Sequence, residues 1–321
     1  MRILLTTASF QETPGRHHEV LAQSGFEAVR AKGPLSEQQM LELVTKDGGF
    51  DGLLNGDDQI TAKVIDAALP RLKVIAKYGI GLDSIDVKYA TSKKLPVLFT
   101  PGVNHTTVAE HTFGLMIALA KHFWPSLRST KSGGWKRITG SELAGKTISV
   151  LGVGRIGKEV IKRAKAFDMN AIGYDQYWDE AFAKQYDVKR AGTIEEAVTQ
   201  ADIVSLHMNL DESNRGFINK NLIGKMRKGS YIINTARGGL VVENDIAEAC
   251  KSGHLGGYGT DVLNEEPPAK DHPFTQIDNI LVTPHIGSRT FESVERQALR
   301  AVQNIVEFLK GGKDYIQANK F

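Results

Sequence analysis

Hydrophobic and polar positions follow two alternating periods along the chain. Short runs of branched apolar residues predict β-strands, and between them apolar residues recur three or four positions apart, which predicts amphipathic helices. In the first hundred residues the predicted strands are 3–6, 27–30, 51–54, 73–76 and 97–100. The predicted helices between them lie near 16–24, 36–45, 61–68 and 87–93. Strands that alternate with helices predict βαβ units and a parallel sheet.

A long apolar helix separates this block from a second one. The helix is predicted over 104–122, and its second half, Phe113–Ala120, is apolar on nearly every face. Such a segment indicates burial against another domain or a second subunit. The strands predicted after it are 147–151, 170–174, 203–207, 231–234, 257–262 and 280–283. A final amphipathic helix is predicted over Phe291–Leu309.

Length, charge and cysteine content narrow the class of protein. The chain has 321 residues, which at roughly 100–200 residues per domain predicts two domains. A net charge of +3 gives no reason to expect a nucleic-acid partner. The longest apolar run is far shorter than the roughly 20 residues that cross a bilayer, and Ile3–Leu5 is too short for a secretory signal. The single cysteine, Cys250, excludes an intramolecular disulfide. We therefore expect a cytoplasmic globular protein with no membrane partner.

A glycine-rich segment follows the predicted strand 147–151. It reads Gly152-x-Gly154-x-x-Gly157, and a helical pattern comes after it. In that context Gly152 permits a tight turn, Gly154 lets a pyrophosphate approach the backbone, and Gly157 lets the helix pack closely on the strand. The helix N-terminus offers free N–H groups to the phosphates. The segment therefore predicts a dinucleotide site rather than an ordinary glycine turn.

An acidic residue, Asp175, ends the next predicted strand, eighteen residues after Gly157. A carboxylate there accepts hydrogen bonds from the ribose 2′-hydroxyl of NAD and repels the 2′-phosphate of NADP. Residues 176–178 contain no arginine that would pair with that phosphate. The sequence predicts NAD as the cofactor, in preference to NADP.

Three charged residues stand beyond the ends of later strands. Arg237 follows the strand 231–234, Glu266 follows 257–262, and His285 follows 280–283. Ligands of doubly wound sheets bind outside the carboxyl ends of the strands, so all three residues point toward one crevice. Taken singly, each also has an ordinary interpretation, because a lone histidine is commonly structural and a glutamate before proline commonly faces solvent.

Together these side chains suit hydride transfer to a 2-keto acid. The guanidinium can bind the substrate carboxylate and polarise the keto group. The imidazolium can donate a proton to the developing alkoxide, and the carboxylate can orient the ring and favour its protonated form. The other histidines have no ligand-like spacing with cysteine or clustered carboxylates, so no metal is expected.

From about residue 50 to 310 the chain resembles the D-isomer-specific 2-hydroxyacid dehydrogenases, which include phosphoglycerate, glyoxylate/hydroxypyruvate and D-lactate dehydrogenases. The resemblance is carried by Gly79–Asp86, Asn104 through Val108–Glu110, Gly152–Gly157, Asn234–Gly238, Glu266-Pro267 and Pro284–Gly287. It implies an NAD-dependent oxidoreductase that interconverts a small D-2-hydroxy acid and its 2-keto acid. It also implies a homodimer, with the helix after Asn104 near the interface.

The resemblance further implies an α/β fold of two doubly wound domains. A flavodoxin-like substrate domain, residues 1–101 and 288–321, would carry an inserted NAD-binding Rossmann domain, residues 102–287. It implies that Arg237 binds substrate, that His285 is the acid/base, and that Glu266 is the partner of His285. The expected cofactor contacts are Gly152, Gly154, Arg155, Ile156, Gly157, Asp175, His207, Thr235, Ala236, Arg237, Asp261, His285 and Gly287. The expected substrate contacts are Asn55, Tyr78, Gly79, Ile80, Gly81, Asn104, Arg237 and His285.

Two of these assignments have plain alternatives, and so does the function. Arg155 equally suits a solvated helix surface, and His207 equally suits a simple strand end. Phosphoglycerate dehydrogenase is the nearest alternative function. A formate-type dehydrogenase is disfavoured because such enzymes carry Gln where Glu266 stands, whereas a phosphite-type enzyme stays open. An NAD-sensing corepressor-like binding module is also disfavoured, because no Pro/Ser-rich tail follows.

The substrate prediction rests on the loop Asn55-Gly56-Asp57-Asp58-Gln59. Phosphoglycerate dehydrogenases usually present an arginine here to the substrate phosphate. Asp57 and Asp58 would instead repel a phosphate if they face the cleft. We therefore expect a small unphosphorylated acid such as glyoxylate, hydroxypyruvate or pyruvate. Lys77, Tyr78 or a basic residue of a partner subunit is the open alternative source of a phosphate contact.

Overall fold

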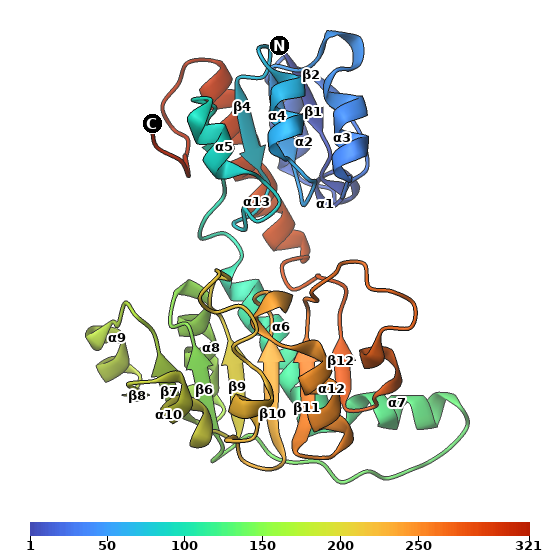
Figure 1. Ribbon diagram of the computed structural model, residues 1–321, viewed down its shortest axis with the longest axis vertical. Coiled ribbons are helices and arrows are strands. Elements are labelled where there is room, and N and C mark those ends of the chain that lie inside the picture. Colours follow the sequence, from blue (N-terminus) through green and yellow to red (C-terminus); the bar gives the residue numbers. More distant parts are fainter. The chain divides into compact units, whose positions relative to one another are not determined.

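The computed structural model describes residues 1–321, which divide into two compact units (Figure 1). Unit 1 contains Met1–Asn104 and Arg289–Phe321, and unit 2 contains His105–Ser288. The boundaries expected from the sequence, after residues 101 and 287, lie next to these divisions. No helix is both long and apolar enough to cross a membrane.

Unit 1 is built on a five-stranded parallel sheet with strand order β2-β1-β3-β4-β5. Its strands are β1 (Arg2–Leu5), β2 (Glu27–Arg30), β3 (Gly52–Asn55), β4 (Val74–Lys77) and β5 (Val97–Leu98). Its helices are α1 (Ala8–Glu12), α2 (Arg16–Gln23), α3 (Glu37–Val44), α4 (Ala62–Ala68), α5 (Val87–Ser92) and, near the end of the chain, α13 (Phe291–Leu309).

Side chains of the unit 1 strands enter two cores, one on each face of the sheet. Ile3 and Leu5 pack with α2 and α13, whereas Leu4 between them packs with α3 and α4. This alternation has the two-residue period of the β-pleat. Because both faces are covered, the inner strands β1, β3 and β4 are mostly apolar and buried, whereas the edge strand β2 has charged ends and is only partly buried. The carboxyl ends of β1, β3 and β4 are neighbours in the sheet.

Unit 2 is built on a seven-stranded parallel sheet with strand order β12-β11-β10-β9-β6-β7-β8. Its strands are β6 (Thr147–Leu151), β7 (Asn170–Tyr174), β8 (Val188–Arg190), β9 (Ile203–Leu206), β10 (Ser230–Asn234), β11 (Leu255–Thr260) and β12 (Ile280–Val282). Its helices are α6 (His105–Ala120), α7 (Phe123–Lys131), α8 (Arg155–Ala166), α9 (Glu180–Gln185), α10 (Ile194–Thr199), α11 (Lys220–Ile223) and α12 (Glu243–Lys251).

The order of the unit 2 strands creates a switch point between β6 and β9. From β6 the chain adds β7 and β8 on one side, and then returns to add β9 to β12 on the other. In a doubly wound sheet the ligand crevice lies at the carboxyl ends of the strands at such a point. Helices α6 and α8 cover one face of the sheet, and α10 and α12 cover the other (Figure 1).

The structure differs from the predicted elements around residue 122. The helix predicted over 104–122 ends at Ala120, because His122 has a φ of +50°, and α7 begins at Phe123. Pro125 fits in the first turn of α7, where a missing N–H group costs no helical hydrogen bond. The pattern also missed α1, α9, α10, α11 and β8, which have between three and six residues each.

Candidate active site

The three glycines after β6 differ in what surrounds them. Gly152 has a φ of +95°, and a Cβ there would stand 2.5 Å from the carbonyl oxygen of His207. A Cβ on Gly157 would stand 2.1 Å from the carbonyl oxygen of Gly152, so the first turn of α8 packs directly on the loop. No protein atom lies within 4 Å of the corresponding position at Gly154. The protein itself therefore gives no steric reason for Gly154, and the open space beside it suits a pyrophosphate.

Asp175 lies beside this loop, just beyond β7. Its carboxylate accepts hydrogen bonds from the backbone N–H groups of Val153 and Tyr177, each at 2.7 Å. The first bond fixes the acidic side chain against the glycine loop, where a ribose would follow the pyrophosphate. Arg155 and Ile156 are the first two residues of α8; Arg155 is exposed, whereas Ile156 packs against the core. The cofactor contact of Arg155 stays a prediction.

His207 follows β9 and also borders the glycine loop, through its carbonyl oxygen. Its Nε2 lies 2.8 Å from the hydroxyl of Ser205, and its Nδ1 is buried without a protein partner. Burial lowers the pKa of His207 to about 3, so the ring is neutral at physiological pH. An uncharged ring with one unused nitrogen suits a contact with a nucleotide.

The turn after β10 carries Arg237 and is held by Asn234. The Asn234 side-chain amide donates to the carbonyl oxygen of Arg237 at 2.9 Å, and its Oδ1 accepts from the backbone N–H of Ala236. Thr235 is nearly buried, with its hydroxyl 2.9 Å from that of Thr112. A Cβ on Gly238 would stand 2.0 Å from the carbonyl carbon of Leu263. Only glycine therefore lets the Arg237 turn lie against the loop after β11.

Glu266 links the loop after β11 to His285. One of its carboxylate oxygens accepts from the backbone N–H of Leu263 at 2.9 Å, and the other accepts from His285 Nδ1 at 2.7 Å. A carboxylate only accepts hydrogen bonds, so this contact places a proton on Nδ1 and makes Nε2 the nitrogen that exchanges a proton. The two side chains are 36% and 44% exposed, so the pair is open to a ligand.

Asp261 holds the turn that carries His285. Its main-chain oxygen accepts from the His285 N–H at 3.0 Å, and its carboxylate accepts from the N–H groups of Ile286 and Gly287. The hydroxyl of Thr283 also donates to this carboxylate, at 2.6 Å. Burial raises the pKa of Asp261, but hydrogen bonds from His111, Thr283, Ile286 and Gly287 outweigh it, and the net pKa is lowered. The charged carboxylate keeps His285 at a φ of +52°.

Unit 1 contributes a second group of predicted site residues, at the carboxyl ends of its strands. Gly79 has a φ of +127°, and its N–H donates to the Thr100 hydroxyl at 3.0 Å. The N–H groups of Ile80 and Gly81, which follow it, make no hydrogen bond within the protein. Two open amides in succession suit a carboxylate.

Three buried side chains near these amides have polar atoms without a hydrogen-bond partner. They are the Thr7 hydroxyl beyond β1, the Asn55 carbonyl oxygen at the end of β3, and the Tyr78 hydroxyl beyond β4. Burial raises the pKa of Tyr78, so its hydroxyl stays neutral. Asn104 ends unit 1 and has a buried carbonyl oxygen without a partner as well. Such atoms usually indicate a missing ligand or water.

The loop after β3 corrects one expectation about the substrate. Asp58 does not face outward: it is fully buried and accepts from the backbone N–H groups of Leu35 and Gly56. Asp57 is exposed, and its carboxylate lies 2.7 Å from Lys77 Nζ. Lys77 is itself buried and also donates to the carbonyl oxygen of Gly56. Of the two carboxylates, only Asp57 is placed to act on a ligand, and a lysine accompanies it.

The sequence analysis did not predict the residues that hold the site residues in place through hydrogen bonds. His111 Nε2 lies 2.8 Å from the Thr283 hydroxyl and 3.3 Å from the Asp261 carboxylate. Thr7 was not singled out, and Asn234 was named only as part of the segment Asn234–Gly238, without a role of its own. Each is a polar residue at a strand end or within an apolar helix, and that contrast is the only signal the sequence offered.

Comparison with known proteins agrees with this geometry. Residues 113–287 match the family model described as the NAD binding domain of D-isomer specific 2-hydroxyacid dehydrogenase, which supports NAD as the cofactor. The chain is 37% identical over 296 residues to a glyoxylate reductase of Thermofilum pendens, an alignment that covers 89% of this chain and 86% of that protein. It is 40% identical over 279 residues to a D-3-phosphoglycerate dehydrogenase of Methanocaldococcus jannaschii, covering 86% of this chain and 52% of that protein.

The chain thus spans about half the length of the phosphoglycerate dehydrogenases that it matches. Among solved structures, the TT0316 protein from Thermus thermophilus has a TM-score of 0.90 and 32% identity, covering 99% of this chain and 100% of that one. The family model covers more than half of the chain, and the relatives extend the likeness over most of the rest. The chain belongs to the D-isomer-specific 2-hydroxyacid dehydrogenase family.

Proposed function

We propose that the protein catalyses the reversible, NAD-dependent interconversion of a small D-2-hydroxy acid and its 2-keto acid. The observation that carries this proposal is the pair Glu266–His285, with a carboxylate oxygen 2.7 Å from Nδ1. It yields a histidine with a fixed tautomer, whose Nε2 is the atom that gives and takes the substrate proton. Bound NAD supplies the acceptor for the hydride, and NADH supplies the donor.

Each of the chain's residues then has a definite task. In the direction of reduction, His285 Nε2 donates its proton to the carbonyl oxygen of the keto acid, which becomes the hydroxyl of the product. Glu266 stabilises the protonated ring and its orientation. Arg237 binds the substrate carboxylate and polarises the carbonyl. Within unit 1, the open N–H groups of Ile80 and Gly81 stay predicted substrate contacts.

A turnover assay with NADH and a panel of 2-keto acids tests this proposal. His285→Ala should lower kcat by about 10²–10⁴-fold. Arg237→Ala should raise KM and lower kcat together, because one guanidinium contacts both the ground state and the transition state. Glu266→Gln should move the pH–rate profile for reduction toward lower pH, because the charge that favours the protonated ring is lost. No reduction of any keto acid by the wild-type protein would refute the proposal.

We further propose that the substrate is unphosphorylated. The groups left open at the carboxyl ends of the unit 1 strands, Thr7, Asn55 and Tyr78, are neutral. The nearby cation, Lys77, is paired with Asp57. A dianionic phosphate would have to compete for that lysine and approach the Asp57 carboxylate. A neutral substituent such as a hydroxyl could instead bond to the open amide and hydroxyl groups.

Phosphoglycerate dehydrogenase is the principal alternative, because Lys77 at the end of β4 is a cation near the predicted site. The deciding measurement is kcat/KM for hydroxypyruvate beside 3-phosphohydroxypyruvate at matched ionic strength. We expect the unphosphorylated acid to be the better substrate. A clear advantage for the phosphorylated one would make the protein a phosphoglycerate dehydrogenase.

We propose that NAD is bound in preference to NADP, supported by the position of Asp175 against the glycine loop. Isothermal titration should show weaker NADPH binding for the wild-type protein and a smaller difference for Asp175→Ala. Equal affinities in the wild-type protein would contradict the proposal. This readout does not depend on turnover.

We also propose that the protein is a cytoplasmic homodimer. The support for a dimer is an apolar surface on α7 and the segment after it, which we call the α7 patch: Phe123, Trp124, Leu127 and Trp135, exposed by between 48% and 79%. Large apolar side chains exposed together along one segment commonly mark an interface between proteins. A fractionation of cells tests the location.

A further inference from the structure

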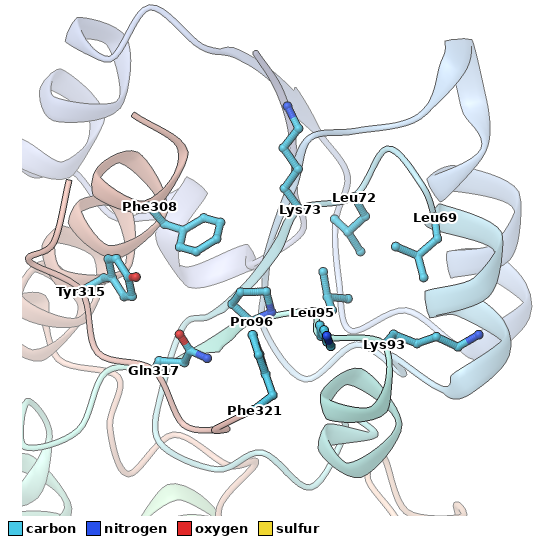
Figure 2. Close-up of a pocket in the computed structure, with 11 residues that line it drawn as sticks. Leu69, Leu72, Lys73, Lys93, Leu95, Pro96, Phe308, Tyr315, Gln317 and Phe321 are labelled. Carbon is cyan, nitrogen blue, oxygen red and sulfur yellow. The ribbon is translucent and has the colours of Figure 1, made fainter. Parts of the chain in front are cut away.

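A hollow of about 450 Å³ lies in unit 1, at the end of the sheet away from the predicted substrate loops (Figure 2). Lys73 directly precedes β4 and Pro96 directly precedes β5, so the hollow lies at the amino ends of these strands. The residues expected to bind substrate follow the carboxyl ends instead. The hollow is therefore separate from these predicted substrate residues. Its volume falls in the range of roughly 300–1,000 Å³ that small-molecule sites occupy.

The floor of the hollow is apolar and fixed. Leu72 and Leu95 are each 3% exposed, and the rings of Phe308 and Tyr315 meet edge to face with centroids 5.4 Å apart. Figure 2 shows these two rings on one side of Pro96 and Leu72 on the other. The segment 316–318 is hydrogen-bonded along β5, through Phe99 N to Ile316 O and Ala318 N to Val97 O. The apolar surface is therefore preformed and needs no rearrangement to bind an apolar ligand.

Three lysines, Lys73, Lys93 and Lys94, line the hollow, and no aspartate or glutamate does. Lys73 pairs with Asp51 at 3.2 Å and Lys93 with Asp66 at 2.9 Å, and Figure 2 shows both side chains pointing away from the apolar floor. Lys94 makes no ion pair. The apolar floor and the Lys94 cation together complement a ligand that has an apolar body and a negative charge.

Lys94 occupies a backbone position where lysine is unfavourable. It lies two residues beyond the end of α5, with a φ of +54°. At the equivalent position after α2, α7, α12 and α13 the chain has a glycine with positive φ: Gly25, Gly133, Gly253 and Gly311. After α8 and α9 it has Asp168 and Asp187, of a residue type that tolerates this conformation better than most. Glycine would end α5 with less strain, so the side chain of Lys94 has a role other than ending the helix.

We propose that this hollow binds a small organic acid, with a hydrocarbon or aromatic body on the apolar floor and its carboxylate at Lys94. The site lies within unit 1 and needs neither the cofactor nor the acid/base pair. Its ligand would therefore act in addition to the substrate rather than in place of it.

Calorimetric titration of the NADH-saturated protein tests the proposal. The probes are 3-phenylpropanoate, which has an aromatic body, a carboxylate and no 2-keto or 2-hydroxy group, and its neutral analogue 3-phenylpropanamide. The wild-type protein should bind the acid more tightly than the amide. Lys94→Gly should weaken binding of the acid by about three- to fivefold, the scale of one exposed ion pair. Binding of the amide should change little.

The Lys94→Gly variant also separates binding from folding. Because glycine relieves the left-handed strain, the melting temperature should stay the same or rise. The matched control is Lys88→Gln, which removes an exposed charge from the same helix outside the hollow. The proposal is overturned if the acid does not bind at millimolar concentration, if both variants weaken it equally, or if a 2-keto acid substrate displaces it competitively.

Discussion

The backbone of His285 shows how single residues build the candidate active site. A left-handed φ is uncommon for histidine, and such residues persist only where neighbours hold them. Asp261 provides that support through its main-chain oxygen and its carboxylate. His111 and Thr283 contact the same carboxylate. We therefore predict that they are positioning residues, which act on His285 through Asp261.

Replacement of His111 should reduce turnover more than it reduces stability. His111→Leu removes the contacts to Thr283 and Asp261, and a hydrogen bond to a charged group contributes about 1.5–3 kcal/mol. We expect kcat for keto-acid reduction to fall by about tenfold, with a smaller change in KM. His111→Gln can still donate to Thr283 or Asp261 and should recover part of the rate. Equal kcat values for the two variants would rule out a positioning role.

The buried ring of His207 should make stability depend on pH. Its pKa of about 3 in the folded protein lies below the ordinary value near 6.5 of an unfolded chain. Between these values the unfolded chain binds a proton that the folded protein does not, so stability falls as the pH falls. In the nucleotide-free protein, the melting temperature of His207→Asn should therefore fall less between pH 6.5 and pH 4.5 than that of the wild type. His122→Asn is the control, and an identical slope for wild type and His207→Asn would contradict the expectation.

The sequence identified candidate site residues, but it did not show which of two adjacent aspartates, Asp57 and Asp58, faces a ligand. Arg237, Glu266 and His285 could be proposed from their places after successive strands, and the structure places Glu266 against His285. Asp57 and Asp58 could not be told apart. Which of them turns inward depends on the donors that the fold brings near, here the N–H groups of Leu35 and Gly56. Residue type and spacing do not carry that information.

Element prediction succeeded where apolar periodicity was long. In unit 1 the sheet strands and the helices of eight or more residues coincide with predicted segments. The inner strands β1, β3 and β4 are buried on both faces and therefore leave a clear apolar run. Helix α7 was missed because its exposed face carries Phe123, Trp124 and Leu127, which hide the amphipathic pattern. The amphipathic pattern identifies helices whose apolar stripe faces the core of their own chain, and α7 has no such stripe.

Two glycines between β6 and α8 should respond differently to substitution. One substitution should mainly change NADH affinity, and the other should mainly change stability. Gly154→Ala meets no protein atom within 4 Å, at a φ of −75° that alanine accepts, so its stability should change by less than about 0.5 kcal/mol. Its affinity for NADH should fall, because the methyl group would occupy the space proposed for the pyrophosphate. Gly157→Ala places Cβ 2.1 Å from Gly152 O and should cost at least about 1–3 kcal/mol.

Denaturant unfolding and NADH titration separate these two effects. We expect Gly154→Ala to lose affinity without losing stability, and Gly157→Ala to lose stability first. Full NADH affinity in Gly154→Ala would place the pyrophosphate elsewhere. Wild-type stability in Gly157→Ala would mean that the loop moves easily, contrary to its close packing on α8.

At the scale of the whole molecule, the division into two α/β units was visible in the sequence as two successive strand–helix series. Neither the chain length nor the interruption of the helical pattern at Ser132–Gly134 showed where the chain passes from one unit to the other. The return of the C-terminal helix to unit 1 was implied by the family resemblance alone. Its packing on β3 and β4 is a contact between residues far apart in sequence, which local patterns do not encode.

The α7 patch makes the oligomeric state the remaining property of the whole molecule to be tested. If a second copy of the chain covers the α7 patch, light scattering should give about twice the chain mass of 35.2 kDa. The double variant Trp124→Glu/Leu127→Glu places two charges in the patch and should shift the protein to monomer, because an unpaired buried charge is costly. Phe291→Glu is the matched control, since Phe291 is 72% exposed in unit 1, outside the patch. A wild-type monomer at micromolar concentration, or an equal shift in the control, would show that the patch serves another purpose.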